Sequence, residues 1–304
     1  MADLGDRTKY LGASEVAAAI GLSRYRTPWD VWAEKVGVVQ PHEAGEAARL
    51  GVALEPAVLS LAEQEFGKLS YDGLELDVPD TPIKAHCDAR LASTGEPVEA
   101  KTAGLLGGHD VEWSTDSVPM EYVVQVTVQA VAAGAEKGFI AGLVAGRGLV
   151  FSRIVVDKQF ADEIIKQALD FWRYVESKKE PPSSPSLSVA SRIVKHESTL
   201  VIAENDPALD VFREYLRLRE ESHLIQKKLD DAKARVLLAM RDNRKAILPD
   251  GKVFYVRNQT RETVDSKRLL KEHPDVYRQY LRETRFDVLT VTESKRNAND
   301  RSLR

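Results

Sequence analysis

The sequence predicts an α/β fold in which a mixed central sheet is flanked by helices, followed by a mainly helical C-terminal region with a small hairpin. Three features predict it. Helical patterns fill the chain up to Gly67, strand patterns separated by turn residues then take over, and a long charged helix follows a segment rich in Lys, Pro and Ser. A chain of 304 residues is long enough for a large domain with an accessory module.

The N-terminal part begins with helices whose ends carry recognisable signals. After an Ala-rich stretch, Thr27 suits the N-cap of the next helix and Pro28 suits its first position. Gly37 and Gly67 are placed to end the second and third helices. The expected helices are residues 13–20, 28–36 and 43–66.

The middle of the chain combines strands with two helices. Turn residues such as Asp80-Thr81-Pro82 separate short apolar runs, and Gly146-Arg147-Gly148 is placed to turn a hairpin. The last helix of this part is amphipathic, because its apolar residues recur on one face. We expect strands at 74–78, 83–91, 97–102, 138–145 and 149–156, and helices at 120–133 and 157–176.

The segment rich in Lys, Pro and Ser marks a boundary between two domains. The expected division is a first domain at 1–178, a linker at 179–198 and an accessory domain at 199–304. The accessory domain begins with a long amphipathic helix that suits a helical hairpin or a coiled coil. Its expected elements are this helix at 207–243, a hairpin around Pro249-Asp250-Gly251, a helix at 266–281 and a frayed end at 294–304.

Composition excludes several kinds of site. Cys87 is the only cysteine, which excludes an intrachain disulfide, a thiolate zinc site and an iron–sulfur cluster. The six histidines are scattered, so carboxylates would have to hold any metal, which favours Mg²⁺ or Mn²⁺. There is no long apolar run and no signal-peptide core, so we expect no membrane contact and a cytoplasmic location. The formal net charge of −4 neither supports nor excludes DNA binding, because a groove needs only local positive charge.

The most informative residues lie on two neighbouring strands. Asp88 lies near the end of one expected strand, and Glu99 and Lys101 lie two apart on the next, so these two face the same side. A hairpin can bring Asp88 beside them. Two carboxylates can hold a hard cation, together with the carbonyl of Ala100, and a lysine can orient water or stabilise developing charge. On spacing alone, an exposed strand face with a Glu–Lys pair is the simpler interpretation, but the apolar opposite face indicates a half-buried strand.

Two further polar residues fit this set. Glu55 closes a G-x-x-x-E block in the long helix upstream, and Gln125 lies on the helix downstream. Taken singly, Glu55 is an ordinary solvated helix residue. Gln125 is surrounded by valines, and a polar group in such company generally has a specific partner.

These blocks, in this order, resemble the phage lambda exonuclease and YqaJ-type viral recombinase nucleases, within the PD-(D/E)xK restriction-endonuclease-like superfamily. The resemblance covers roughly Arg7 to Glu176. It rests on five blocks, which are Leu11-Gly12-Ala13-Ser14-Glu15-Val16, the G-x-x-x-E block ending at Glu55, Asp88, Glu99-Ala100-Lys101 and Tyr122-x-x-Gln125.

The resemblance implies a role for each residue. Asp88, Glu99 and the Ala100 carbonyl would be the ligands of Mg²⁺, which Mn²⁺ can replace, and Lys101 would be the catalytic lysine. Glu55 would assist at the metal through water or a second ion, and Gln125 would orient the lysine or the attacking water. Cys87 stands where the family usually has a proline, and Ala100 is a short version of an aliphatic residue; neither departure removes a ligand.

The resemblance also implies contacts with DNA. Arg7 and Ser14 match positions that hold the 5′-phosphate of a DNA end, and Arg suits a phosphate because its guanidinium donates two hydrogen bonds. The alternative for Arg7 is an ordinary charge in a flexible N-terminus. Arg24 and Arg26 are candidate contacts to the DNA backbone.

The resemblance favours an exonuclease that degrades double-stranded DNA ends, 5′ to 3′, in phage-type recombination. Its partner would be a single-strand annealing protein of the RecT or Beta type, it would act as a homo-oligomer, and a phage-encoded enzyme would work in the cytoplasm of its bacterial host. Two alternatives remain: an endonuclease or RecB-like nuclease, and a catalytically silent module that binds DNA or a partner. The silent module would be marked by a lost ligand, and Asp88, Glu99 and Lys101 are all present.

Overall fold

The computed structural model divides into two units, Met1–Lys195 and His196–Arg304, and each is described by itself. It describes residues 6–41, 45–104, 113, 117–145, 148–194, 199–256, 260, 262–282 and 289–291. The division falls inside the segment expected as a linker. That segment contains a helix, α6 (Leu187–Ile193), whose Val189 joins the core of the first unit. The backbone N–H of Ser186 also donates to the buried carboxylate of Asp30 at 2.9 Å, so α6 is fastened to the first unit.

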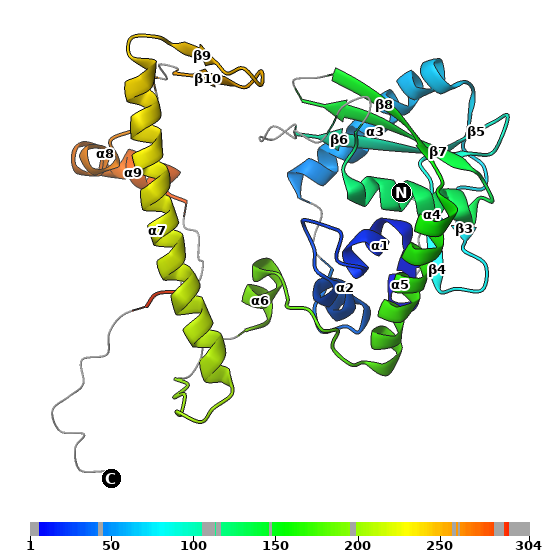
Figure 1. The fold of residues 1–304 in the computed structure, drawn as a ribbon, viewed down its shortest axis with the longest axis horizontal. Coiled ribbons are helices and arrows are strands. Elements are labelled where there is room, and N and C mark those ends of the chain that lie inside the picture. The colour runs from blue at the N-terminus through cyan, green and yellow to red at the C-terminus, as the bar shows by residue number, and fades with distance from the viewer. Residues whose placement is uncertain are drawn as a thin grey trace. The chain divides into compact units, whose positions relative to one another are not determined.

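A five-stranded mixed sheet forms the centre of the first unit (Figure 1). Its order is β2-β5-β6-β7-β8, with β6 and β7 parallel and the other pairs antiparallel. Helices cover both faces, which confirms the predicted fold class. The strands are β2 (Leu69–Ser70), β5 (Ala89–Leu91), β6 (Pro97–Ala103), β7 (Lys137–Val144) and β8 (Gly148–Val155).

Alternate residues of this sheet pack against helices on opposite faces. Phe139 and Ala141 of β7 lie in one apolar cluster with residues of α3 (Glu46–Phe66). Ile140 lies in another with Val126 of α4 (Met120–Ala132). Because successive side chains of a strand point to opposite faces, α3 and α4 cover the two sides of the sheet. Residue 43, the expected start of α3, is outside the described residues.

A smaller sheet, in the order β1-β4-β3, lies beside the first. Its strands are β1 (Leu11–Gly12), β3 (Glu75–Asp77) and β4 (Ile83–His86). The single strand predicted over 83–91 was therefore wrong, because the chain leaves one sheet after His86 and enters the other at Ala89. Cys87 and Asp88 make this crossing: the Cys87 N–H bonds to the carbonyl of Leu74, and the Asp88 side chain bonds to the neighbouring strand.

The remaining helices of this unit bury a second core. They are α1 (Ala13–Ala19), α2 (Pro28–Lys35) and α5 (Lys158–Ser177), and with α4 they enclose Trp29 and Trp32. Thr27 caps α2 as predicted, since its hydroxyl accepts from the backbone N–H of Asp30. The turn at Gly146-Arg147, predicted to join β7 and β8, lies outside the described residues.

The second unit contains a long helix, a hairpin and two short helices. These are α7 (Ala208–Met240), β9 (Lys245–Ile247) paired with β10 (Val253–Tyr255), α8 (Ser266–Glu272) and α9 (Pro274–Tyr280). The single helix predicted over 266–281 was wrong, because Pro274 disfavours helical backbone at His273, whose φ is −138°. The frayed end predicted at 294–304 is outside the described residues. Among the described helices, none is long and apolar enough to cross a membrane.

Candidate active site

Two neighbouring strands place the predicted acids and lysine together. Ala89 of β5 pairs with Val98 of β6, which sets Asp88, just before β5, beside the residues that follow Val98. Val98 packs in the core against α3. Because successive side chains of a strand alternate, the side chains of Glu99 and Lys101 project from the opposite face of β6. Asp88, Glu99, Lys101 and Gln125 all line one cavity of about 670 Å³.

Asp88 is fixed by the backbone of β6. Its Oδ2 accepts a hydrogen bond of 2.8 Å from the backbone N–H of Ala100. In an extended strand the N–H and C=O of one residue point to the same edge, so the Ala100 carbonyl faces Asp88 as well. Burial, followed by the negative charge of Glu99, raises the pKa of Asp88 to about 8.

Glu99 is the centre of a dense hydrogen-bond network. Its side chain is buried, and its Oε1 accepts from Lys101 Nζ at 2.5 Å and from Gln125 Nε2 at 2.6 Å. Its Oε2 accepts from Gln129 Nε2 at 2.6 Å. Both carboxylate oxygens of Glu99 are therefore held in a fixed orientation by donors from β6 and α4.

Lys101 is a charged partner of this carboxylate. Burial lowers the pKa of Lys101, but the nearby charges of Glu99 and Asp88 outweigh this effect and leave the pKa above its ordinary value. Its ammonium also lies 5.4 Å from the centre of the Tyr122 ring. Lys101 is therefore protonated at neutral pH and suited to stabilising negative charge.

Helix α4 supplies two glutamines to the site, of which the sequence reasoning identified one. Gln125 contacts Glu99, so it acts on Lys101 through the carboxylate that both share. Gln129, one turn further, is fully buried, and its Nε2 bonds both Glu99 and the carbonyl of His86 at 2.8 Å. The i, i+4 spacing of two glutamines on an apolar helix was the signal that could have revealed it.

Glu55 lies on a separate side of Lys101. It lines a cavity of about 430 Å³ that also contacts Gly51, Ala100 and Lys101. Gly51 allows this approach, since a Cβ on it would lie 3.3 Å from Thr102 Oγ1 of β6. The charge of Glu55 contributes to raising the pKa of Asp88, so its carboxylate acts on the site electrostatically.

Arg7 and Ser14 line the same cavity as Asp88 and Lys101. Arg7 is in the short helix η1 (Arg7–Lys9), and Ser14 is exposed in the first turn of α1. Because one cavity includes all four residues, a single bound molecule could contact Arg7, Ser14, Asp88 and Lys101 together.

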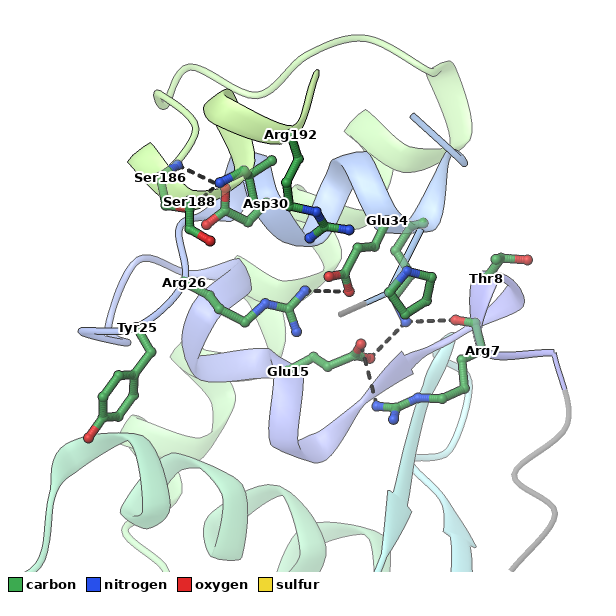
Figure 2. Close-up of a pocket in the computed structure, with 13 residues that line it drawn as sticks. Arg7, Thr8, Glu15, Tyr25, Arg26, Asp30, Glu34, Ser186, Ser188 and Arg192 are labelled. Atoms are coloured by element: carbon green, nitrogen blue, oxygen red, sulfur yellow. Dashed lines mark hydrogen bonds and ion pairs between the residues drawn. The ribbon is translucent and has the colours of Figure 1, made fainter. Parts of the chain in front are cut away.

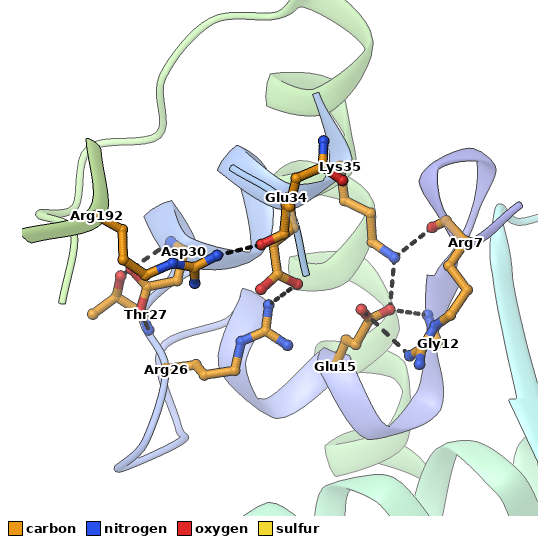
Figure 3. Close-up of polar contacts among 10 residues, drawn as sticks. Arg7, Gly12, Glu15, Arg26, Thr27, Asp30, Glu34, Lys35 and Arg192 are labelled. Carbon is orange, nitrogen blue, oxygen red and sulfur yellow. Dashed lines mark hydrogen bonds and ion pairs between the residues drawn. The ribbon is translucent and has the colours of Figure 1, made fainter. Parts of the chain in front are cut away.

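A buried ion pair that the sequence reasoning missed holds Arg7 in place (Figure 3). Lys35 of α2, with only 2% of its side chain exposed, donates to Glu15 Oε2 at 2.7 Å and to the Arg7 carbonyl at 2.6 Å. Glu15 Oε1 lies 3.4 Å from the Arg7 guanidinium, and Glu15 Oε2 accepts from the Gly12 N–H at 2.9 Å. Lys35 thus binds the backbone of Arg7 while Glu15 binds its side chain.

Arg24 and Arg26 do not line the cavity of about 670 Å³. Arg26 donates to Glu34 at 2.6 Å and lines an adjoining cavity of about 340 Å³ with Arg7 and Arg192 (Figure 2). Arg24 lies 3.9 Å from Glu121 and 5.1 Å from the centre of the Tyr25 ring. Their contact with DNA stays a prediction.

The oxygen donors of the site suit a small divalent cation. Among the described residues, no three His, Cys, Asp or Glu side chains are grouped closely enough to hold a metal by themselves. The available ligands are instead the carboxylates of Asp88 and Glu99 and the carbonyl of Ala100, with solvent completing the shell. Mg²⁺ suits such a set because it keeps several waters and binds through one or two carboxylates. Burial is the main cause of the raised pKa of Asp88, and the nearby charge of Glu99, which a bound cation would offset, adds to it.

Comparison with known proteins finds a family that matches part of the chain. Residues 4–136 match the YqaJ-like viral recombinase domain. The matched residues include Asp88, Glu99, Lys101 and Gln125, which line the cavity described above.

One similar protein matches nearly the whole length of this chain. The uncharacterized protein YqaJ of Bacillus subtilis (strain 168) is 26% identical over 300 residues, which cover 95% of this chain and 92% of that protein. An alkaline exonuclease from Laribacter hongkongensis is similar in structure, with a TM-score of 0.44 and 18% identity over 57% of this chain and 91% of that one. A phage related exonuclease from Haemophilus somnus 129PT has a TM-score of 0.43 and 14% identity over 56% of this chain and 96% of that one.

Proposed function

We propose that this chain is a magnesium-dependent exonuclease that degrades double-stranded DNA from its ends, in the 5′ to 3′ direction. One observation supports it most: two carboxylates and a protonated lysine from neighbouring strands line one cavity with Arg7 and Ser14. The match of residues 4–136 to the YqaJ-like viral recombinase domain supports a role in phage-type recombination. A single-strand annealing protein of the RecT or Beta type would then use the exposed strand.

The residues divide the chemistry among them. Asp88, Glu99 and the Ala100 carbonyl would hold the cation, which lowers the pKa of a coordinated water and offsets charge on the phosphate. Lys101, protonated through its contact with Glu99, stabilises the negative charge that develops on the attacked phosphate. Gln125 and Gln129 keep the Glu99 carboxylate oriented, since they donate to its two oxygens.

Arg7 and Ser14 would position the DNA end. An arginine guanidinium binds phosphate through paired hydrogen bonds, and the Ser14 hydroxyl can add another. Binding a terminal phosphate fixes the strand so that the next phosphodiester reaches Asp88 and Glu99. This arrangement favours an exonuclease over an endonuclease.

One assay separates the alternatives. End-labelled linear duplex and closed circular duplex are incubated with Mg²⁺ or with a chelator. The expected result is that the linear duplex is degraded when Mg²⁺ is present and that the closed circle stays intact. Cleavage of the circle identifies an endonuclease, and no cleavage of either substrate identifies a silent binding module. Lys101→Ala serves as the catalytic control, and Lys158→Ala, at an exposed position at the start of α5, makes the same change away from the site.

A further inference from the structure

Helix α7 carries apolar side chains that no described part of the chain covers. Only Met240 of this helix is buried, and none of the described helices or strands packs extensively against it. Val211 is 68% exposed, Ile225 64% and Leu229 59%. Apolar surface of this extent on a helix favours association with another surface.

The exposed side chains follow a heptad repeat. Along α7, apolar or small residues recur at spacings that alternate between four and three, as at the a and d positions of a coiled coil. These a and d positions form one continuous seam along the helix, made of Val211, Tyr215, Leu218, Ser222, Ile225, Leu229, Ala232, Val236 and Ala239. The adjacent seam, which begins at Phe212 and Leu216, becomes polar at Arg219, so only the first seam runs the length of the helix.

Charges beside this seam change sign at the middle of the helix. The g positions, which flank each a position, are Glu214, Glu221, Lys228 and Arg235. The acids occupy the N-terminal half and the bases occupy the C-terminal half. In a coiled coil these positions interact across the interface and set the orientation of the partner.

An antiparallel partner with the same sequence satisfies all four charges. With the two-fold axis at the level of His223 and Leu224, Glu214 faces Arg235 of the second copy. Glu221 then faces Lys228 of the second copy, and symmetry repeats both pairs. A shift by one heptad in either direction sets Lys228 against Lys228 or Glu221 against Glu221, so neighbouring registers are disfavoured.

The same register also matches side-chain volumes and helix length. It sets Tyr215 opposite Ala232 and Leu218 opposite Leu229, so the largest residue of the seam meets one of the smallest. It also overlaps the helices over nearly their full extent, since residues 208 and 239 lie opposite each other. Three independent properties therefore select one register.

We propose that α7 pairs with α7 of a second copy of this chain as an antiparallel two-stranded coiled coil. This inference does not depend on the proposed nuclease activity. Glu221 contacts Arg217 of its own helix at 2.6 Å, but both side chains are more than half exposed. Exposed pairs of this kind contribute little, so Glu221 can exchange that partner for Lys228 of the second copy.

Charge reversal on the full chain tests the orientation. Sedimentation velocity measures the dimer dissociation constant of two variants, Glu214→Lys with Glu221→Lys and Lys228→Glu with Arg235→Glu. Each places like charges at every facing g position, so each should weaken the dimer at least about tenfold. Mixing the two variants makes every facing pair opposite again and should restore dimerisation as a heterodimer. Glu220→Lys with Asp231→Lys, on the outer face, is the matched control and should leave the dimer unchanged.

Cysteine pairing tests the register in the same full chain. Ser222 faces Ile225 of the second copy, so Ser222→Cys with Ile225→Cys should form a disulfide-linked dimer on oxidation, while neither single variant should. Cys87 is buried and adds little background. Cross-linking by a single variant, or tighter association of the Lys228→Glu variant, would identify a parallel pair. Either result, or an assembly mass that none of the g-position variants alters, overturns the proposal.

Discussion

Removing the charge of Asp88 should stabilise the protein when no divalent cation is present. The pKa of Asp88 is raised from 3.8 to about 8 by burial and by the charge of Glu99. A carboxyl whose pKa is raised on folding contributes most stability below its unfolded pKa and loses it as the pH rises through the folded value. Wild-type protein in a chelator should therefore lose stability as the pH rises from about 4 to about 8, and the Asp88→Asn variant should not show this loss.

The magnitude follows from the pKa shift. About 1.4 kcal/mol per pKa unit gives a ceiling of roughly 6 kcal/mol for a shift from 3.8 to about 8. Relaxation and entry of water reduce such penalties, so a gain of roughly 2–3 kcal/mol is expected above pH 8. For a unit of this size, that gain raises the midpoint of thermal unfolding by roughly 5–10 °C.

Thermal unfolding between pH 5 and pH 9 checks this expectation, in a chelator and in Mg²⁺. Mg²⁺ at about a hundred times its dissociation constant should stabilise the wild type by about 2.7 kcal/mol, and Asp88→Asn by much less. Asp72→Asn, in the exposed turn after β2, is the matched control. A difference between Asp88→Asn and wild type that does not change with pH would refute the reasoning.

Three further predictions concern residues that support the site. Glu15→Gln leaves Lys35 buried without its charged partner, so the free energy of unfolding in urea should fall by about 3–5 kcal/mol. Adding Lys35→Met should recover this stability but should not restore a preference for 5′-phosphorylated ends. If that preference did return, Glu15 would have no role in orienting Arg7. Gln129→Leu removes a hydrogen-bond donor from Glu99, so the free energy of unfolding should fall by about 1–3 kcal/mol and turnover should fall as well. Unchanged turnover would exclude a positioning role for Gln129. Gly51→Val should push α3 away from β6 and lower turnover, whereas Gly45→Ala, where an added Cβ meets nothing within 4 Å, should not; equal effects in a nuclease assay would contradict the close packing.

Much of the first unit could be predicted from the sequence because its signals are local. Thr27 and Pro28 mark the start of α2, and a period of two residues places Glu99 and Lys101 together. The break at Cys87 and Asp88 could not be predicted, because it depends on a choice between two sheets rather than on propensity. Pro274 did carry a local signal for the division between α8 and α9, which the apolar periodicity on either side obscured.

The candidate site shows the same division between local and distant information. The residue types and their order along the chain indicated Asp88, Glu99, Lys101 and Gln125. Gln129 was missed although its i, i+4 spacing from Gln125 was a local signal, and its contact with Glu99, thirty residues away, forms only on folding. Arg24 and Arg26 were predicted as contacts to the DNA backbone; neither lines the cavity of the two carboxylates, and Arg26 pairs with Glu34, so this contact stays a prediction.

The sequence by itself determined which side chains are available: two acids and a lysine at the spacing of adjacent strands, and a heptad repeat with charges that reverse along one helix. These properties are periodic, so they are visible in the chain before it folds. The tertiary structure alone decided that Asp88 lies at the crossing between two sheets, that Lys35 and Glu15 fix Arg7, and that both oxygens of Glu99 receive donors. The reason is that hydrogen bonds and burial depend on distance in space, and residues far apart in sequence acquire that distance only when the elements pack.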